Sequence, residues 1–247
     1  MKHKAAHGQD SNQAALRALF EAIAAREPET AGRLLVATPS LATLPLELGA
    51  SRADASSNYF KTIEHYAYAG DTALHLAAAA YATEIALRLL ATGARVNAKN
   101  RRGAEALHYA TDGIPGSPAW DPDAQRAMVE LLIQAGANPN ALDNSGVAPL
   151  HRAVRTRSAS AVRALLSNGA QVRLKNKSGS TPLHLAVQTT GRGGSGSLIA
   201  RAQQAQIIGL LLEHGARASD QDTKGKSVTA CVTLDWVREL LNDADHS

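Results

Sequence analysis

The sequence has 247 residues and a formal charge of +4, with 45% hydrophobic residues, 4% aromatic residues and one cysteine. This hydrophobic content excludes a disordered chain, and the scarcity of aromatic residues favours close-packed helices over a sheet. The lone Cys231 excludes an internal disulfide framework and argues against a cysteine-based zinc site. Because no long apolar run occurs, we expect no secretory signal, no membrane span and a cytoplasmic location.

The N-terminal region is predicted to begin with a disordered tail over residues 1–12 and to continue as a degenerate capping repeat over residues 13–67. Two apolar faces at helical spacing indicate two helices, at Leu16, Leu19, Phe20 and Ile23, and at Leu34, Leu35 and Val36. An aromatic-containing insertion lies between Pro39 and Ala67. We expect one face of a short helix to fill the core of the cap, or else to form a binding pocket edged by Tyr68; this face comprises Tyr59, Phe60, Ile63 and Tyr66.

Four copies of one motif follow. Residues 70–75 read GDTALH, and the motif recurs as GAEALH, GVAPLH and GSTPLH, so that the copies end at His75, His108, His151 and His184. These histidines are separated by 33, 43 and 33 residues, and each copy is followed by a double leucine and a Gly-Ala pair. Repetition at this period indicates a stacked array rather than a globule with one centre.

The last clear copy shows the physics of one repeat. Thr181 is a good N-cap, and Pro182 stands at the first helical position, where its missing N–H costs nothing. A second helix has an apolar face around Leu211 and ends at Gly215, because glycine adopts the left-handed conformation readily. A polar segment with a turn-forming glycine comes next, as a hairpin requires. These segments, here called fingers, span residues 95–104, 138–147, 171–180 and 217–226.

The combination of T-P-L-H, a double leucine, Gly-Ala and N-A-x-[DN]-x-x-G at a period of 33 resembles the ankyrin repeat, and the chain resembles bacterial ankyrin-repeat proteins. The resemblance implies an all-α solenoid of about six helix-turn-helix units with short β-hairpin fingers. We expect repeats over residues 68–226 and degenerate caps at both ends. The C-terminal cap spans residues 227–247 and has a last apolar face at Trp236, Val237, Leu240 and Leu241.

Two repeats are longer than the others, by 10 and 13 residues between the motif histidine and Gly-Ala. The extra residues fall between the two helices of each repeat, near 111–124 and 189–204. The run GRGGSGS at 191–197 lacks the Lys-Ser/Thr end of a phosphate-binding loop and follows a helix, so we interpret it as part of an insertion. The insertions are either neutral additions or an extra lateral surface, with Trp120 as its candidate contact residue.

Candidate catalytic and metal-binding groups are sparse. The four motif histidines occupy one phase in different repeats, so the resemblance implies that they hydrogen-bond backbone and keep neighbouring repeats in register. Their spacing does not match the pairs found in helical metal sites. Cys231 lies in an apolar cap, where most lone cysteines are inert. We expect no enzyme activity, no metal and no cofactor.

Positive charge is concentrated on the fingers. They contain ten basic and three acidic residues, which leaves the rest of the chain with a net negative charge. Arg152, Arg155 and Arg157 of the middle repeat are expected to extend the positive charge onto the concave face. Such a face favours an acidic protein patch and speeds encounter with it. The alternative is a solvated positive edge that keeps the chain soluble.

The resemblance implies that partners contact finger tips and inner helices. The candidate partner-binding residues, carried over by phase and joined by Trp120, are Tyr68, Asp71, Lys99, Arg101, Arg102, Asp112, Asn144, Arg155, Lys177, Gln188, Lys224 and Lys226. We expect a monomeric, non-catalytic protein-binding module. Two alternatives stay open. One is a nucleic-acid-associated protein, disfavoured because the fingers lack interleaved aromatic residues. The other is a small-ligand protein or enzyme with a site near His65, Tyr66 and Asp71.

Overall fold

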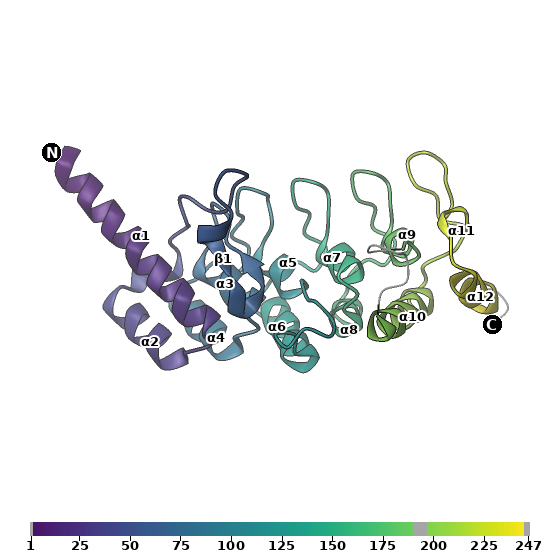
Figure 1. The fold of residues 1–247 in the computed structure, drawn as a ribbon, viewed down its shortest axis with the longest axis horizontal. Helices are drawn as coiled ribbons and strands as arrows, with labels where there is room; N and C mark the ends of the chain where they lie inside the picture. Colours follow the sequence, from purple (N-terminus) through teal and green to yellow (C-terminus); the bar gives the residue numbers. More distant parts are fainter. Residues whose placement is uncertain (1, 190–196, 245–247) are drawn as a thin grey trace. The chain divides into compact units, whose positions relative to one another are not determined.

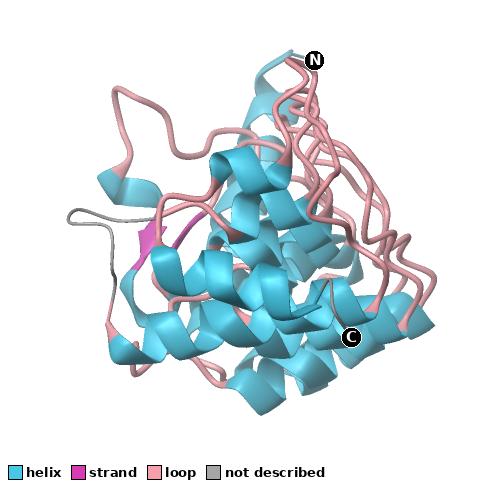
Figure 2. Ribbon diagram, turned by 90° about the vertical axis from the view of Figure 1, so that its right-hand side faces the viewer, coloured by secondary structure: helices cyan, strands magenta, loops and turns pink. Residues whose placement is uncertain are grey.

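The computed structural model describes residues 2–189 and 197–244, and within these ranges the chain forms twelve α-helices and one short two-stranded sheet (Figures 1 and 2). This confirms the expected class, an all-α array of ankyrin type. The chain divides into two compact units, residues 1–110 with 131–137 (unit 1) and residues 111–130 with 138–247 (unit 2). Helix α6 (Pro122–Gln134) has residues in both.

Unit 1 stacks its helices in two layers. In one layer α3 packs against both α1 and α5, and in the other α2 packs against α4. Leu16, Phe20 and Ile23 of α1 form a buried face at helical spacing, whereas the short α3 is buried along its whole length, including Leu74 and Leu76. The helix bounds are α1 Lys2–Ala24, α2 Pro28–Ala37, α3 Ala73–Ala79, α4 Thr83–Ala91 and α5 Ala106–Ala110.

The N-terminal cap differs from the prediction at two points. Helix α1 extends back to Lys2, into the segment where the sequence predicts a disordered tail over residues 1–12. The packed residues from Leu16 onward hold a helix that alanine, lysine and glutamine can continue toward the N-terminus at little cost. The second apolar face is also narrower than predicted, because Leu35 is buried while the side chain of Val36 is 84% exposed.

The aromatic insertion forms a β-hairpin and not the predicted short helix. Tyr59–Phe60 (β1) pairs antiparallel with His65–Tyr66 (β2), and Tyr59 lies opposite Tyr66. A 3-10 turn over Lys61–Ile63 and the left-handed backbone of Glu64, at φ 50°, reverse the chain between the strands. Alternation along the strand buries Phe60 and leaves Tyr59 and Tyr66 about 40% exposed. The insertion therefore fills the core of the cap only in part. Two further 3-10 turns precede the hairpin, at Pro39–Ala42 and Ser56–Asn58.

Unit 2 repeats the same two-layer stacking. α7, α9 and α11 follow one another in the layer of first helices, and α8, α10 and α12 follow one another in the layer of second helices. Valine, leucine and isoleucine at helical spacing fill the space between the layers, including Val154, Leu183 and Leu211. The helix bounds are α7 Pro149–Arg155, α8 Ala159–Ser167, α9 Pro182–Ala186, α10 Leu198–Glu213, α11 Val228–Cys231 and α12 Asp235–Ala244.

The extra residues of the two long repeats divide between loop and helix. The loop 111–121 is longer than the connections 80–82 and 156–158 of the regular repeats, and eleven residues, 187–197, separate α9 from α10. The second helices lengthen as well, because α6 has 13 and α10 has 16 residues where α4 and α8 have 9. The predicted insertions at 111–124 and 189–204 thus reach into helices. Of the glycine run, 191–196 lies outside the described residues. Ser197 caps α10 by accepting from the Ala200 amide at 3.2 Å.

Neighbouring fingers of unit 2 lie against each other through glycine. Gly179 has φ +74°, and a Cβ atom built there would overlap the backbone amide of Thr223 in the next finger. The Thr223 hydroxyl donates to the Ser178 carbonyl at 2.8 Å, and Lys177 Nζ donates to the Asn144 carbonyl at 2.5 Å. Glycine is therefore required at this position for its left-handed backbone and for the close approach of two chains.

Substitution of Gly179 by alanine tests this close approach, and Gly225 is a matched control. Gly225 has φ +73° but no described atom within 4 Å of its added Cβ. Gly225→Ala should therefore cost only the left-handed penalty, about 1 kcal/mol. Gly179→Ala adds a backbone clash and should cost roughly 2–4 kcal/mol. The measurement is urea unfolding of both variants, and equal losses of stability would refute the finger contact.

Candidate functional site

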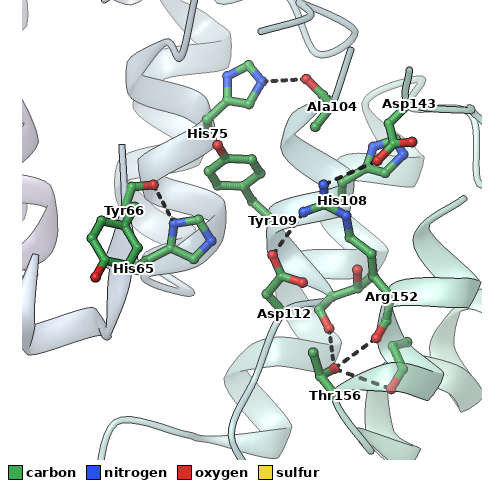
Figure 3. Close-up of polar contacts among 12 residues, drawn as sticks. His65, Tyr66, His75, Ala104, His108, Tyr109, Asp112, Asp143, Arg152 and Thr156 are labelled. Atoms are coloured by element: carbon green, nitrogen blue, oxygen red, sulfur yellow. Dashed lines mark hydrogen bonds and ion pairs between the residues drawn. The ribbon is translucent and has the colours of Figure 1, made fainter. Parts of the chain in front are cut away.

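The motif histidines bond each repeat to the next through backbone groups. His75 Nδ1 accepts from the Thr72 amide at 3.1 Å, and its Nε2 donates to the Ala104 carbonyl at 3.1 Å (Figure 3). His151 does the same between the Ala148 amide and the Ser180 carbonyl, both at 3.2 Å. All four rings are buried. This is the geometry of a structural residue and leaves neither ring nitrogen of His75 or His151 for a metal or substrate.

His184 shares this arrangement, and His108 shares its Nδ1 contact. His184 Nδ1 lies 3.2 Å from the Thr181 amide that donates to it, and Nε2 lies 3.2 Å from the Lys226 carbonyl. His108 Nδ1 accepts from the Glu105 amide at 3.1 Å. Glu105 replaces the threonine of the motif, and burial raises the pKa of its carboxyl group, which Lys99 only partly offsets from 3.8 Å.

The histidine contacts predict how stability depends on pH. Burial lowers the pKa of His151 below its ordinary value of 6.5, although the bond to Ser180 acts in the opposite direction. As the pH falls, the unfolded chain therefore takes up a proton at this residue at a higher pH than the folded chain does. The free energy of unfolding should be highest above about pH 6.5 and should fall as the pH drops toward the lower folded pKa. His151→Gln should show a smaller decrease between pH 7 and pH 5 in urea unfolding. Identical pH slopes for the two proteins would contradict this.

The fingers expose their cations and use their acidic residues internally. All ten basic residues of the fingers are exposed: Arg95, Lys99, Arg101, Arg102, Arg173, Lys175, Lys177, Arg217, Lys224 and Lys226. Asp220 is buried and pairs with Arg173, whose Nε lies 3.1 Å from both carboxylate oxygens. Asp143 accepts from two amides of its own turn and lies 3.5 Å from Arg152. Each acidic residue thus stabilises a finger and is not free for a partner.

Asp222 completes this pattern. Its carboxylate accepts from the amides of Lys224 at 2.8 Å and Lys226 at 3.0 Å, which closes the turn of the last finger. The bond from Lys226 is the main reason that the pKa of Asp222 lies below its ordinary value. The two lysine side chains at this turn point to solvent.

The structure sorts the predicted partner-binding residues by exposure. Nine are exposed: Lys99, Arg101, Arg102, Asn144, Arg155, Lys177, Gln188, Lys224 and Lys226. Three are half-buried: Tyr68, Asp112 and Trp120. Asp71 is fully buried. The exposed residues form two groups, one in each unit.

Asp71 is a structural residue, which corrects its prediction as a partner contact. Its carboxylate accepts from the Tyr68 amide at 2.6 Å and from Asn100 Nδ2 at 2.8 Å. The Tyr109 hydroxyl lies 2.9 and 2.8 Å from the two carboxylate oxygens. Since the side chains of Asn100 and Tyr109 are buried with it, Asp71 holds the base of the first finger together. These contacts also remove Asp71 from the proposed small-ligand site near His65 and Tyr66.

The middle repeat adds less positive charge than predicted. Arg152 pairs with Asp112 at 3.0 Å and with Asp143 at 3.5 Å (Figure 3). Arg157 is 7% exposed, and desolvation lowers the pKa of its guanidinium group. Only Arg155 of the three arginines is exposed. The sequence could not show this, because Asp112, the nearer of the two carboxylates in space, lies 40 residues away from Arg152 along the chain.

Trp120 is tied to the body of unit 2. Its indole Nε1 donates to Gln125 Oε1 at 3.0 Å, and the Ser158 hydroxyl donates to the same oxygen. Gln125 itself is fully buried. The side chain of Trp120 therefore anchors the loop 111–121. Only the exposed part of this half-buried side chain is accessible to a partner.

The two insertions meet in unit 2. An added Cβ at Gly116 of the first loop would lie 3.8 Å from Ile199 Cδ1 of the extended α10. Apolar side chains are exposed on both segments, with Ile114 at 55%, Ile199 at 51% and Leu198 at 82%. The expected lateral surface thus has adjoining contributions from both insertions, and its most exposed residues were not predicted from the sequence.

A row of tyrosine and arginine side chains in unit 1 was also only partly predicted. The ring centres of Tyr59 and Tyr66 are 4.7 Å apart, and those of Tyr66 and Tyr68 are 6.4 Å apart. The guanidinium carbon of Arg102 lies 4.2 Å from the centre of the Tyr68 ring, as a cation–π contact requires. Arg101 lies 5.7 Å from the same ring and donates to the Ala50 carbonyl. The hairpin thereby extends the first finger with exposed aromatic residues.

The described part of the chain contains no candidate metal site and no candidate membrane-spanning helix. No group of three or more His, Cys, Asp or Glu side chains there could hold a metal ion. No helix in the described ranges is long and apolar enough to cross a membrane.

The Asp71 network predicts a loss of stability that is separate from binding. Asp71→Ala leaves the buried donors of Asn100 and Tyr109 without their acceptor and should cost roughly 2–4 kcal/mol in urea unfolding. Arg102→Ala, at the exposed end of the same finger, should cost no more than about 0.5 kcal/mol. If the two variants were equally stable, Asp71 would not have the structural role assigned to it.

Comparison with known proteins agrees with this geometry. Residues 123–222 match the family model for ankyrin repeats in three copies, and residues 69–101 match the model for a single ankyrin repeat. The neurogenic locus notch homolog protein 1 of Danio rerio is 33% identical over an alignment that covers 37% of this chain and 5% of that protein. The chain therefore spans only a small part of this relative. Repeats of this family generally mediate contacts between proteins. With its helix pairs, fingers and histidine bonds in phase, this chain belongs to the ankyrin-repeat family.

Proposed function

We propose that this chain is a non-catalytic protein-binding module that recognises an acidic surface on its partner through the fingers. The proposal rests on the difference between the basic and the acidic side chains of the fingers. Every basic residue of the fingers is exposed, whereas Asp143, Asp220 and Asp222 are bonded to backbone amides or to arginine. The surface that a partner meets is therefore more positive than the formal count of residues indicates.

Each unit offers its own part of this surface. In unit 1 the first finger combines Arg101 and Arg102 with the half-buried Tyr68. Tyrosine and arginine are the residue types that contribute most to binding energy at protein interfaces. In unit 2 the last two fingers supply lysine at their tips, including Lys177, Lys224 and Lys226. Long-range attraction from these charges speeds encounter with an acidic partner and weakens with salt.

The tyrosines do not favour nucleic acid as the partner. Tyr59, Tyr66 and Tyr68 already pack against one another, and the guanidinium group of Arg102 lies over the Tyr68 ring. Bases stack on exposed ring faces, and this row offers few of them. A protein segment that lies along the ring edges uses the same residues without separating them.

Charge reversal at the last finger tests the proposal. Lys224→Glu with Lys226→Glu removes two exposed cations and keeps the backbone amides that bond Asp222. Affinity purification from native lysate with each protein as bait, read by quantitative mass spectrometry, should show partners lost by the variant. Titration calorimetry of a recovered partner should then show binding weakened about tenfold, because opposed charges at a rim reduce the encounter rate and the affinity.

Lys224→Gln with Lys226→Gln is the matched control and should give an intermediate effect. Both variants should unfold within about 0.5 kcal/mol of the wild type, because the substituted side chains are exposed. Partners captured equally by the wild type and the charge-reversed variant would contradict the proposal. Tight binding to a generic oligonucleotide, falling steeply with salt, would assign the charge to nucleic acid instead.

A further inference from the structure

A basic pocket lies between the last two fingers of unit 2. It encloses about 400 Å³ and is lined by residues that include Arg173, Lys175, Arg217, Ser219, Asp220 and Gln221. Three of these side chains are cations and one is a carboxylate, so the pocket has a net charge of +2 at neutral pH. A hydroxyl and an amide add uncharged donors.

The same place one repeat earlier arranges its charge differently, because Ser219 and Gln221 correspond there to Arg173 and Lys175, while the three cations of the pocket are replaced by uncharged residues. Counted from the glycine that ends each second helix, Arg173 corresponds to Asn140, Lys175 to Leu142, and Arg217 to Gln171. The side chain of Asn140 joins the two fingers by bonding only to backbone groups. It donates to the Gly169 carbonyl at 3.0 Å and accepts from the Gln171 amide at 2.7 Å. Stacking of two fingers therefore does not require a cation at the positions of Arg173, Lys175 and Arg217.

Asp220 orients one side of the pocket without neutralising it. Its buried carboxylate lies 3.1 Å from Arg173 Nε, and it also accepts from the backbone amide of Arg217 at 3.3 Å. This pairing holds the plane of one guanidinium group in place. In the described residues, Lys175 and the side chain of Arg217 have no carboxylate within ion-pair distance. Two cations thus stay available beside an arginine that is already positioned.

We propose that this pocket binds a phosphoryl group on a serine or threonine side chain of the protein partner. A phosphate monoester carries a charge close to −2 at neutral pH and three acceptor oxygens, which matches a pocket of charge +2 with several donors. A carboxylate carries half that charge and one oxygen fewer. The inference rests on the proposed function, since it names one anionic group of the partner, and it concerns a site distinct from the finger tips.

The chain supplies its own substitutions for the test. Lys175→Leu with Arg217→Gln installs the residues of the preceding finger pair and leaves the Arg173–Asp220 pair intact. The probe is N-acetyl-phosphoserine methylamide, titrated into the full chain at constant ionic strength and followed by 15N chemical shifts. We expect shifts confined to residues 173–175 and 217–221, and affinity reduced at least about tenfold in the variant, as loss of two charge-assisted bonds implies. Lys224→Gln with Lys226→Gln, which removes the same charge outside the pocket, should change affinity less than about twofold.

Two further probes test the ligand class. N-acetyl-glutamate methylamide should bind at least about tenfold more weakly than the phosphoserine probe, because it carries one charge fewer. Equal binding of glutamate would overturn the phosphoryl assignment, and tighter binding of inorganic phosphate would overturn the assignment to a partner side chain. Shifts that are absent, or unchanged in the pocket variant, would overturn the site itself. The proposed recognition of an acidic partner by the fingers is tested separately, because the substitutions at Lys224 and Lys226 lie outside this pocket.

Discussion

The structure depends on one hydrogen-bonded connection. In it, the motif histidine at the start of a repeat is bonded to the end of the finger that leads into the next repeat. Its Nδ1 accepts from the amide at the start of its own helix, and its Nε2 donates to a carbonyl 29 to 42 residues later in the chain. A single helix pair cannot bury its apolar faces alone, so stability comes from stacking. The neutral imidazole fixes the register of that stacking, because the ring satisfies a buried donor in one repeat and a buried acceptor in the next.

The fingers follow from the same connection. The carbonyls that accept from His151 and His184 belong to residues at the ends of fingers, so the histidines anchor the base of each hairpin. Above the base, an aspartate or asparagine at a constant position accepts from amides of its own turn, as Asp143, Asn176 and Asp222 do. Acidic side chains are in this way drawn into the fingers, while lysine and arginine cannot accept from these amides and their side chains stay exposed. A separation of charge results from the local geometry of each turn.

The insertions are additions to a repeat that stays in phase. In unit 1 the hairpin at residues 59–66 buries Phe60 and places Tyr59 and Tyr66 beside the first finger. In unit 2 the loop 111–121 is anchored through Trp120 and Gln125 and meets the extended α10 near Ile199. Each addition exposes large side chains that the repeat does not need for its core. They enlarge the surfaces on which recognition can take place without altering how the repeats stack.

The sequence by itself determined the periodic features. Thr181, Pro182 and Gly215 specify where helices begin and end, because capping and left-handed backbone are properties of adjacent residues. The phase of the motif also singled out Lys99, Lys177, Lys224 and Lys226 as candidate contacts, and all four are exposed. Tertiary structure decided the rest. Asp71 and Arg157 look like surface charges but are buried, and Trp120 is held by a glutamine. The pocket at Arg173 and Arg217 needs two fingers separated by more than 40 residues. These outcomes depend on contacts between distant segments, and local spacing carries no information about which of them form.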